Sequence, residues 1–201
     1  MRQIKNKKAQ GVFGMSFSMI FSIFIIIFII SVAFFAIRHF VGLWRCSSVG
    51  LYYEDLREEV RDAWSATSGW YQDEWTGELP SGMFGTGITH VCFGDLSATT
   101  DPGSWASIKD ELIKKYRYNP NGGENVFMYP PDKACASDLG AITLKCNGAD
   151  CMTTEISVNT PSGVVMQPKF FCVEVKKDGK VSVWLVKKST DYKVTVRDTA
   201  P

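Results

Sequence analysis

The sequence predicts an α+β protein in which a long N-terminal helix, partly transmembrane, precedes a small antiparallel β-sheet domain with disulfides. The residues from Ala9 to Ile37 carry no charge and are mostly Phe, Ile, Met, Val and Ser, and about 20 apolar residues suffice to cross a bilayer. A helical apolar pattern then continues to about residue 67 without a proline. Beyond it, short alternating runs separated by Gly and Pro indicate strands, and all six cysteines follow the apolar run.

The charges around the apolar run predict a single-pass membrane protein of the cell membrane. Basic residues without acids precede it, and acids become frequent after residue 53. The positive-inside rule therefore places the N-terminus in the cytoplasm and the C-terminal domain outside. The expected parts are a cytoplasmic basic segment (1–9), a transmembrane helix (10–37), an extracytoplasmic helix extension (38–68) and an extracytoplasmic α+β domain (69–201).

Two other interpretations of the apolar run are weaker. A buried core helix of this length would normally show a polar face. A cleaved secretory signal peptide would have a shorter apolar region, and it would end in a small-x-small site, which this sequence lacks.

The helix extension is predicted to be amphipathic. Apolar residues recur three or four positions apart, namely Leu43, Val49, Tyr53, Leu56, Val60 and Trp64. Gly42 and Gly50 each weaken a helix by about 1 kcal/mol relative to Ala. The apolar stripe needs cover, either from the C-terminal domain or from a neighbouring copy.

Short elements follow in the C-terminal domain. Residues 88–93, 126–129, 141–145, 155–158 and 192–196 are expected as strands, and 105–116 as a short helix capped by Ser104, Asp101 or Ser107. The clearest local signal is Asp178-Gly179, which predicts a hairpin between the runs 170–176 and 181–186.

The stretch from Trp70 to Gly87 is expected to be a loop because it is rich in Gly and contains Pro80. It places Trp70, Tyr71 and Trp75 beside three acids, a combination that can bind sugars or cations. These three aromatics are therefore the candidate ligand residues. The alternative is that they pin the loop to the domain.

The cysteines predict a disulfide framework, because an even number in an extracytoplasmic domain usually pairs. Fifteen pairings are open to six cysteines. We expect Cys146 and Cys151 to close a small loop or each to reach a neighbour, and Cys92 and Cys172 to bridge adjacent strands. A zinc site made from Cys146, Cys151 and Cys135 is the alternative, but oxidation competes with it outside the cell. Cys46 is the hardest to place.

No catalytic, cofactor-binding or metal-binding residue is predicted. His39 and His90 lack a partner at ligand spacing, and neither a nucleophile elbow nor a phosphate loop is present. His90 and Cys92 would share one face of a strand, but nothing places them in a cleft. Asp95 with Asp101, or Asp138 with Asp150, could form a carboxylate pair, but surface loops commonly hold such acids. An anchored enzyme is thus a third hypothesis without nominated residues, and the net charge of +1 argues against nucleic acid as a partner.

One pair of small residues bears on assembly within the membrane. Ser18 and Ser22 form a small-xxx-small pair, which lets helices approach closely in lipid. Two serines that a hydrophobic helix merely tolerates are the alternative.

The segment Lys7-Lys8-Ala9-Gln10 has a basic residue, a small residue and then the polar start of the apolar run. It resembles the class III signal of archaeal type IV pilins and archaellins. That resemblance implies cleavage between Ala9 and Gln10 by a membrane peptidase, and assembly through the N-terminal helix. Gly14 stands where bacterial-type pilins carry a glutamate, so their assembly salt bridge is not carried over.

The overall plan is similar to that of pilin-like subunits. The resemblance implies a pilin-like or pseudopilin-like structural subunit at the cell surface, with the bilayer and copies of itself or other pilin-like subunits as partners. Through Leu79-Pro80-Ser81-Gly82 and Val91-Cys92-Phe93 the chain also resembles single-pass membrane proteins of small-genome archaea, which implies no function. The alternative function is a membrane-anchored binding module that recognises a cell-surface ligand or partner.

Overall fold

The computed structural model describes residues 10–66, 70–81, 85–98, 100–116, 123–134, 139–160 and 163–201. The chain forms two compact units, one ending at Leu43 and one running from Trp44 to Pro201. Of the predicted processing site, Ala9 lies outside the described residues, and Gln10 is the first residue of helix α1.

Helix α1 (Gln10–Ser65) contains 56 residues and confirms the long N-terminal helix. In the first unit its large apolar side chains between Met19 and Phe40 are 43–77 % exposed. Among the described residues, α1 is the one helix long and apolar enough to cross a membrane, with a mean hydropathy of 3.1 in its most apolar window.

In the second unit α1 buries one stripe of side chains. Val49, Leu56 and Val60 are fully buried, Tyr53 is 2 % exposed, and Tyr52 and Ala63 join them in one core cluster. The predicted amphipathic pattern is thus observed from Val49 onward, whereas Leu43, in the first unit, is 54 % exposed. The spacing of three and four residues turns this stripe toward the sheets.

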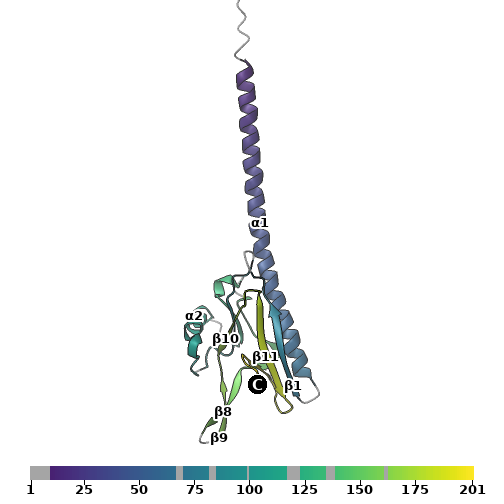
Figure 1. Cartoon of the computed structure of the whole chain (residues 1–201), viewed down its shortest axis with the longest axis vertical. Helices are drawn as coiled ribbons and strands as arrows, with labels where there is room; N and C mark the ends of the chain where they lie inside the picture. The colour runs from purple at the N-terminus through teal and green to yellow at the C-terminus, as the bar shows by residue number, and fades with distance from the viewer. Residues whose placement is uncertain are drawn as a thin grey trace, which may run out of the picture. The chain divides into compact units, whose positions relative to one another are not determined.

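One four-stranded sheet has the order β1-β11-β12-β7. Its strands are β1 (Trp70–Glu78), β11 (Lys180–Lys188), β12 (Val194–Arg197) and β7 (Met152–Thr153). The pair β12–β7 is parallel and the other pairs are antiparallel. Figure 1 shows β1 and β11 side by side next to the C-terminal turns of α1. Alternate residues such as Trp75, Val183 and Val196 fill the core that the α1 stripe also fills.

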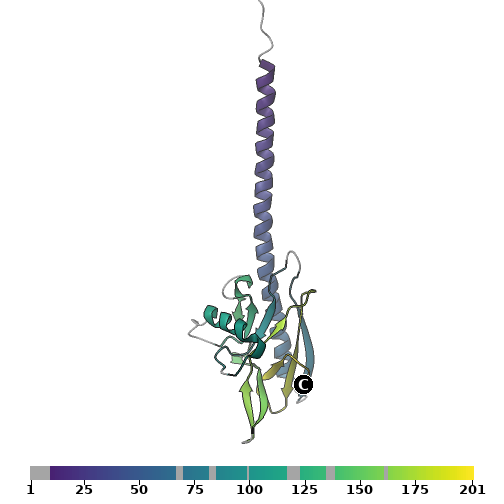
Figure 2. The ribbon, with the colours of Figure 1, turned by 60° about the vertical axis from the view of Figure 1, so that its left-hand side comes forward.

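The second four-stranded sheet is antiparallel and buried on both faces. Its order is β10 (Phe171–Glu174), β2 (His90–Phe93), β3 (Val126–Tyr129) and β4 (Ala141–Ile142). One face joins the core under α1. The other packs on helix α2 (Ala106–Tyr116), which follows the 3-10 turn η1 (Gly103–Trp105). Figure 2 shows α2 against this sheet. Burial on both faces explains the continuous apolar runs Val91–Phe93 and Val126–Met128.

Smaller elements complete the unit. They are the 3-10 turn η2 (Pro131–Lys133) and two two-stranded sheets, β5 (Lys145–Cys146) with β6 (Ala149–Asp150), and β8 (Glu155–Thr160) with β9 (Gly163–Pro168). The run 141–145, expected as one strand, is divided between β4 and β5.

The loop predicted for 70–87 is wrong over its first nine residues, which form β1. All nine pair with β11, from Trp70 opposite Lys188 to Glu78 opposite Lys180. The glycines and Pro80 made the whole segment look irregular, and β1 also contains three acids. The acids lie at exposed positions of an edge strand, where they are tolerated and discourage further pairing.

The predicted hairpin at Asp178-Gly179 is correct in its turn and wrong in its pairing. Gly179 has φ +85°, and the Lys176 amide donates to the Lys180 carbonyl across the turn at 3.0 Å. The two flanking strands nevertheless enter different sheets, because β10 pairs with β2 and β11 pairs with β1 and β12. The turn therefore connects the two sheets.

Candidate functional site

The three candidate ligand aromatics lie on β1 and do not share one surface. Trp75 is 7 % exposed, and its ring meets Tyr52 edge-on at a centroid distance of 5.3 Å. The Tyr71 hydroxyl donates to the Glu59 carboxylate on α1; burial and this bond raise the pKa of Tyr71. Successive strand residues face opposite sides, so Trp70, 63 % exposed, points away from the other two. Trp75 and Tyr71 thus attach the strand to the core.

Gly77 is required where β1 passes the rings of Trp75 and Tyr52. A Cβ at Gly77 would lie 2.4 Å from the Trp75 ring and 2.6 Å from the Tyr52 ring. The glycine that made the segment look like a loop is therefore needed for close packing of two aromatic rings.

Two disulfides join cysteines that the sequence analysis had considered as partners. Cys92 and Cys172 are directly opposite on β2 and β10, with their Cα atoms 3.9 Å apart. Cys146 and Cys151 close a short loop around β5 and β6. Both pairs match the expected partners, and the thiol needed for a Cys92–His90 pair or a zinc site is not free. Cys46 is also disulfide-bonded, and Cys135 lies outside the described residues.

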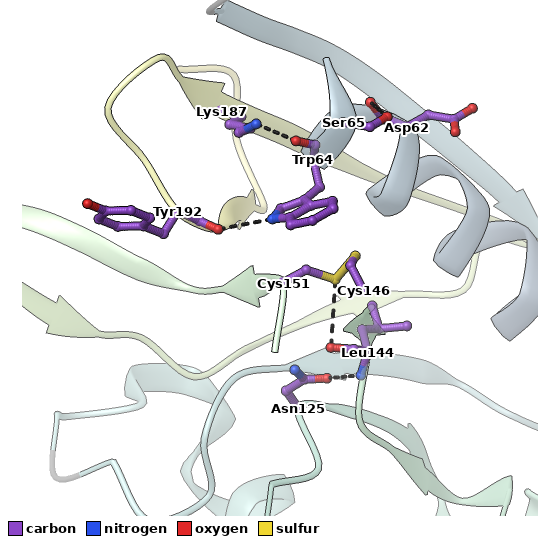
Figure 3. Close-up of a disulfide and its surroundings, with 9 residues drawn as sticks. All are labelled: Asp62, Trp64, Ser65, Asn125, Leu144, Cys146, Cys151, Lys187 and Tyr192. Atoms are coloured by element: carbon purple, nitrogen blue, oxygen red, sulfur yellow. Dashed lines mark hydrogen bonds between the residues drawn. A yellow bond between two sulfur atoms is a disulfide. The ribbon is translucent and has the colours of Figure 1, made fainter. Parts of the chain in front are cut away.

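The surroundings of the Cys146–Cys151 disulfide are shown in Figure 3. The Leu144 amide donates to the side-chain oxygen of Asn125 at 2.9 Å, which fixes the strand entering the disulfide loop. Nearby, the Trp64 indole N–H donates to the Tyr192 carbonyl at 3.1 Å, and the Lys187 ammonium donates to the Trp64 carbonyl. These bonds tie the last turn of α1 to β11 and to the loop that follows it.

His90 lies against three neighbouring side chains. The His90 Nδ1 lies 2.9 Å from the Thr89 hydroxyl, and its ring packs edge-on against Trp105 and Tyr129. Burial lowers the pKa of His90, so the imidazole is neutral near pH 7. Within the described ranges no group of three or more His, Cys, Asp or Glu side chains is placed to hold a metal ion.

A crevice of about 580 Å³ in the second unit lies beside α2 and between segments that are distant in sequence. Its floor is apolar. Phe127 and Met152 are 1 % and 3 % exposed, and the Tyr116 ring lies 5.9 Å from the Phe127 ring. Ile113 and Leu96 add apolar walls. The volume is within the range of small-molecule sites, about 300–1,000 Å³.

The rim of the crevice is acidic. Four carboxylates line it, those of Asp95, Glu124, Asp150 and Glu155. Lys193 is the one basic side chain among the described residues of the lining. The Asp95 carboxylate accepts bonds of 2.7 Å from the Ser97 amide and hydroxyl, which fix its position.

The Tyr116 hydroxyl is buried and has no hydrogen-bond partner among the described residues. Burial raises the pKa of Tyr116 to about 12, and the negative charges of Asp132 and Glu124 contribute to the shift. The phenol is therefore neutral near pH 7.

Sequence reasoning did not find the crevice. The paired acids it considered were Asp95 with Asp101 and Asp138 with Asp150, whereas the structure places Asp95 and Asp150 around one cavity; Asp138 lies outside the described residues. The lining comes from segments between residues 94 and 193, so no local spacing could have indicated it.

Comparisons of this chain with protein-family models, with curated proteins and with solved structures find no match. What the protein does is therefore inferred from its own residues: the apolar helix, the disulfide-bonded domain and the acid-rimmed crevice.

Proposed function

We propose that the protein is a membrane-anchored extracytoplasmic structural protein, a pilin-like or pseudopilin-like subunit that assembles through its N-terminal helix. The observation that carries the proposal is the dual character of α1. Its residues from Met19 to Phe40 expose apolar side chains, whereas Val49, Leu56 and Val60 are buried in a disulfide-bonded domain.

The polar groups of the apolar part suit a bilayer. In lipid every hydrogen-bonding group needs a partner within the protein. The Ser22 hydroxyl donates to the Ser18 carbonyl at 2.9 Å, and the Ser31 hydroxyl donates to the Ile27 carbonyl at 2.8 Å. These serines therefore add no unsatisfied donor to a membrane span.

The disulfides support an extracytoplasmic location for the second unit, because disulfides persist in oxidising compartments and are rare in the cytosol. The basic residues before the apolar run favour the same orientation, with the N-terminus in the cytoplasm.

Two helix glycines support assembly with a neighbour. A Cβ added at Gly42 or at Gly50 would meet no atom of the described residues within 4 Å. Each glycine therefore costs about 1 kcal/mol relative to Ala without relieving a clash with any of these residues. Close approach of a helix from another subunit would explain why glycine occupies these two positions. Leu51, next to Gly50, is 67 % exposed and would be covered by the same neighbour.

The test is crosslinking in native membranes with a photoreactive amino acid at Leu51, and at Glu58 as the control. The proposal expects adducts between copies, or with another membrane subunit, from position 51, and their loss in Gly50→Leu. Mass spectrometry of the sheared surface fraction should find a mature N-terminus at Gln10. A chain beginning at Met1 that is absent from sheared material and gives no adducts would contradict assembly and leave a simple anchor.

A single-pass membrane-anchored binding module is the second candidate, and the crevice favours it. A structural subunit needs no cavity of about 580 Å³ with an apolar floor and a charged rim, whereas small-molecule sites commonly combine these features. The two functions are compatible within one chain.

A further inference from the structure

We propose that the crevice binds a small organic cation, an amine or quaternary ammonium group carried on an apolar body. The proposal rests on the second candidate function and specifies its ligand. It is independent of assembly through the helix.

The apolar floor favours a ligand with an apolar body. Phe127 and Met152 form the base and have almost no exposed surface of their own. An apolar group of the ligand seated above them would remove its own apolar surface from water, which favours binding. A small, fully hydrated ion would gain nothing from this floor.

The acidic rim favours a ligand with a positive charge. The four carboxylates come from four places in the chain: after β2 (Asp95), before β3 (Glu124), in β6 (Asp150) and at the start of β8 (Glu155). Asp150 and Glu155 have no ion-pair partner among the described residues. Like charges converging on one concave surface raise the local concentration of cations and repel anions. Binding of phosphates, nucleotides and carboxylate ligands is therefore disfavoured.

The aromatic wall favours an organic cation over a metal ion. The Tyr116 ring is half-buried, and its plane is inclined by 43° to that of Phe127. A cation within about 6 Å of an aromatic face is attracted by the ring quadrupole. No three ligating side chains of the described residues come together as a metal ion would require. The four carboxylates line the crevice without forming such a group, which favours an extended cationic molecule.

The test uses the oxidised full chain in neutral maltoside micelles with ¹³C-labelled methionine methyl groups. Met152 lines the crevice, while Met128, in the core and outside the lining, is the internal control. The probes are 2-phenylethylamine and its neutral analogue 2-phenylethanol. We expect the amine to shift the Met152 resonance saturably, to leave Met128 in place, and to bind at least about ten-fold more tightly than the alcohol.

Variants separate charge from fold. Asp150→Asn combined with Glu155→Gln should weaken amine binding about ten-fold, and Lys193→Gln should strengthen it about two- to five-fold. The matched control is Asp110→Asn, since Asp110 is exposed on α2 and is not among the described residues lining the crevice. It should change affinity less than about two-fold, because exposed charges are screened. If the double variant does not fold, the Lys193 variant and the salt dependence of amine binding test the role of charge instead. Amine binding that weakens as salt is added would support the role of the carboxylates.

Two results would overturn the proposal in different ways. Equal binding of the amine and the alcohol at Met152 would mean a ligand site without selection for cations, and the binding module would stand. No Met152 shift with either probe would remove both the cation site and the main support for the binding module. The proposal of a membrane-anchored structural protein would be unaffected.

Discussion

The two parts of helix α1 share one secondary structure and have different surroundings. In the first unit Ile26, Phe28 and Phe35 are 56–77 % exposed, with apolar residues on all sides. In the second unit Leu56 and Val60 are fully buried, while Glu54 and Glu58 on the other face are exposed. The comparison shows that helix formation is common to both parts, whereas the distribution of charge decides what covers each part.

This difference predicts different responses to mutation. The second part should depend on the disulfide-bonded domain, because its stripe is part of that core. The first should depend on a bilayer, because no side chain of the described residues covers it. Four predictions test this separation, from the largest effect to the smallest.

Loss of the Cys92–Cys172 disulfide should have the largest effect, and it should be confined to the second unit. The bond joins residues 80 apart, so the loop-entropy model predicts a loss of about 4–5 kcal/mol. For Cys146–Cys151, five residues apart, the model predicts about 2 kcal/mol. Denaturant unfolding of the paired Cys→Ala variants in micelles measures both losses. Equal losses, or release of the reduced protein from membranes, would contradict the separation.

Leu56→Ala should cost about 3–4 kcal/mol of unfolding free energy, because it leaves a cavity in a fully buried position. Leu51→Ala is the matched control on the same helix. Leu51 is 67 % exposed, so its truncation should cost less than about 0.5 kcal/mol. A similar cost at both positions would show that the orientation of the helix in the second unit is wrong.

Ile26→Arg should impair membrane insertion without changing the unfolding of the second unit. A charge at the centre of a span costs about 2.5–3.5 kcal/mol on insertion scales. Ile26→Ala is the control and should insert normally. Membrane-integrated protein after carbonate extraction is the measured quantity. Full integration of the arginine variant would argue against a span at this position.

Gly50→Ala should stabilise the second unit by about 0.5–1 kcal/mol, since alanine favours the helix and its Cβ meets nothing within 4 Å. Thermal unfolding in micelles detects the change. A loss of stability would mean that the space around Gly50 is filled within the monomer, which would weaken the argument for a neighbouring subunit.

Patterns that depend on local chemistry were predictable from sequence. Strand 126–129 has the expected bounds because an apolar run ends at Pro130-Pro131. The turn at Asp178-Gly179 forms because glycine adopts the positive φ that it needs. The stripe from Val49 to Val60 follows from helical periodicity.

Features that depend on distant partners were not predictable. Strand β1 exists because β11 offers nine paired residues, and Gly77 is explained only by the rings of Trp75 and Tyr52. The separation of β10 from β11 depends on β2 and its disulfide. The crevice needs segments between residues 94 and 193 to meet, so its acids carried no local signal.

The most direct test of the two environments of α1 is photolabelling in sealed proteoliposomes with a diazirine reagent confined to the hydrocarbon layer, followed by peptide mapping. The account predicts labels between residues 19 and 37 and none at Leu56 or Val60. Labels on the second unit, or an unlabelled 19–37 segment in the same vesicles, would contradict it.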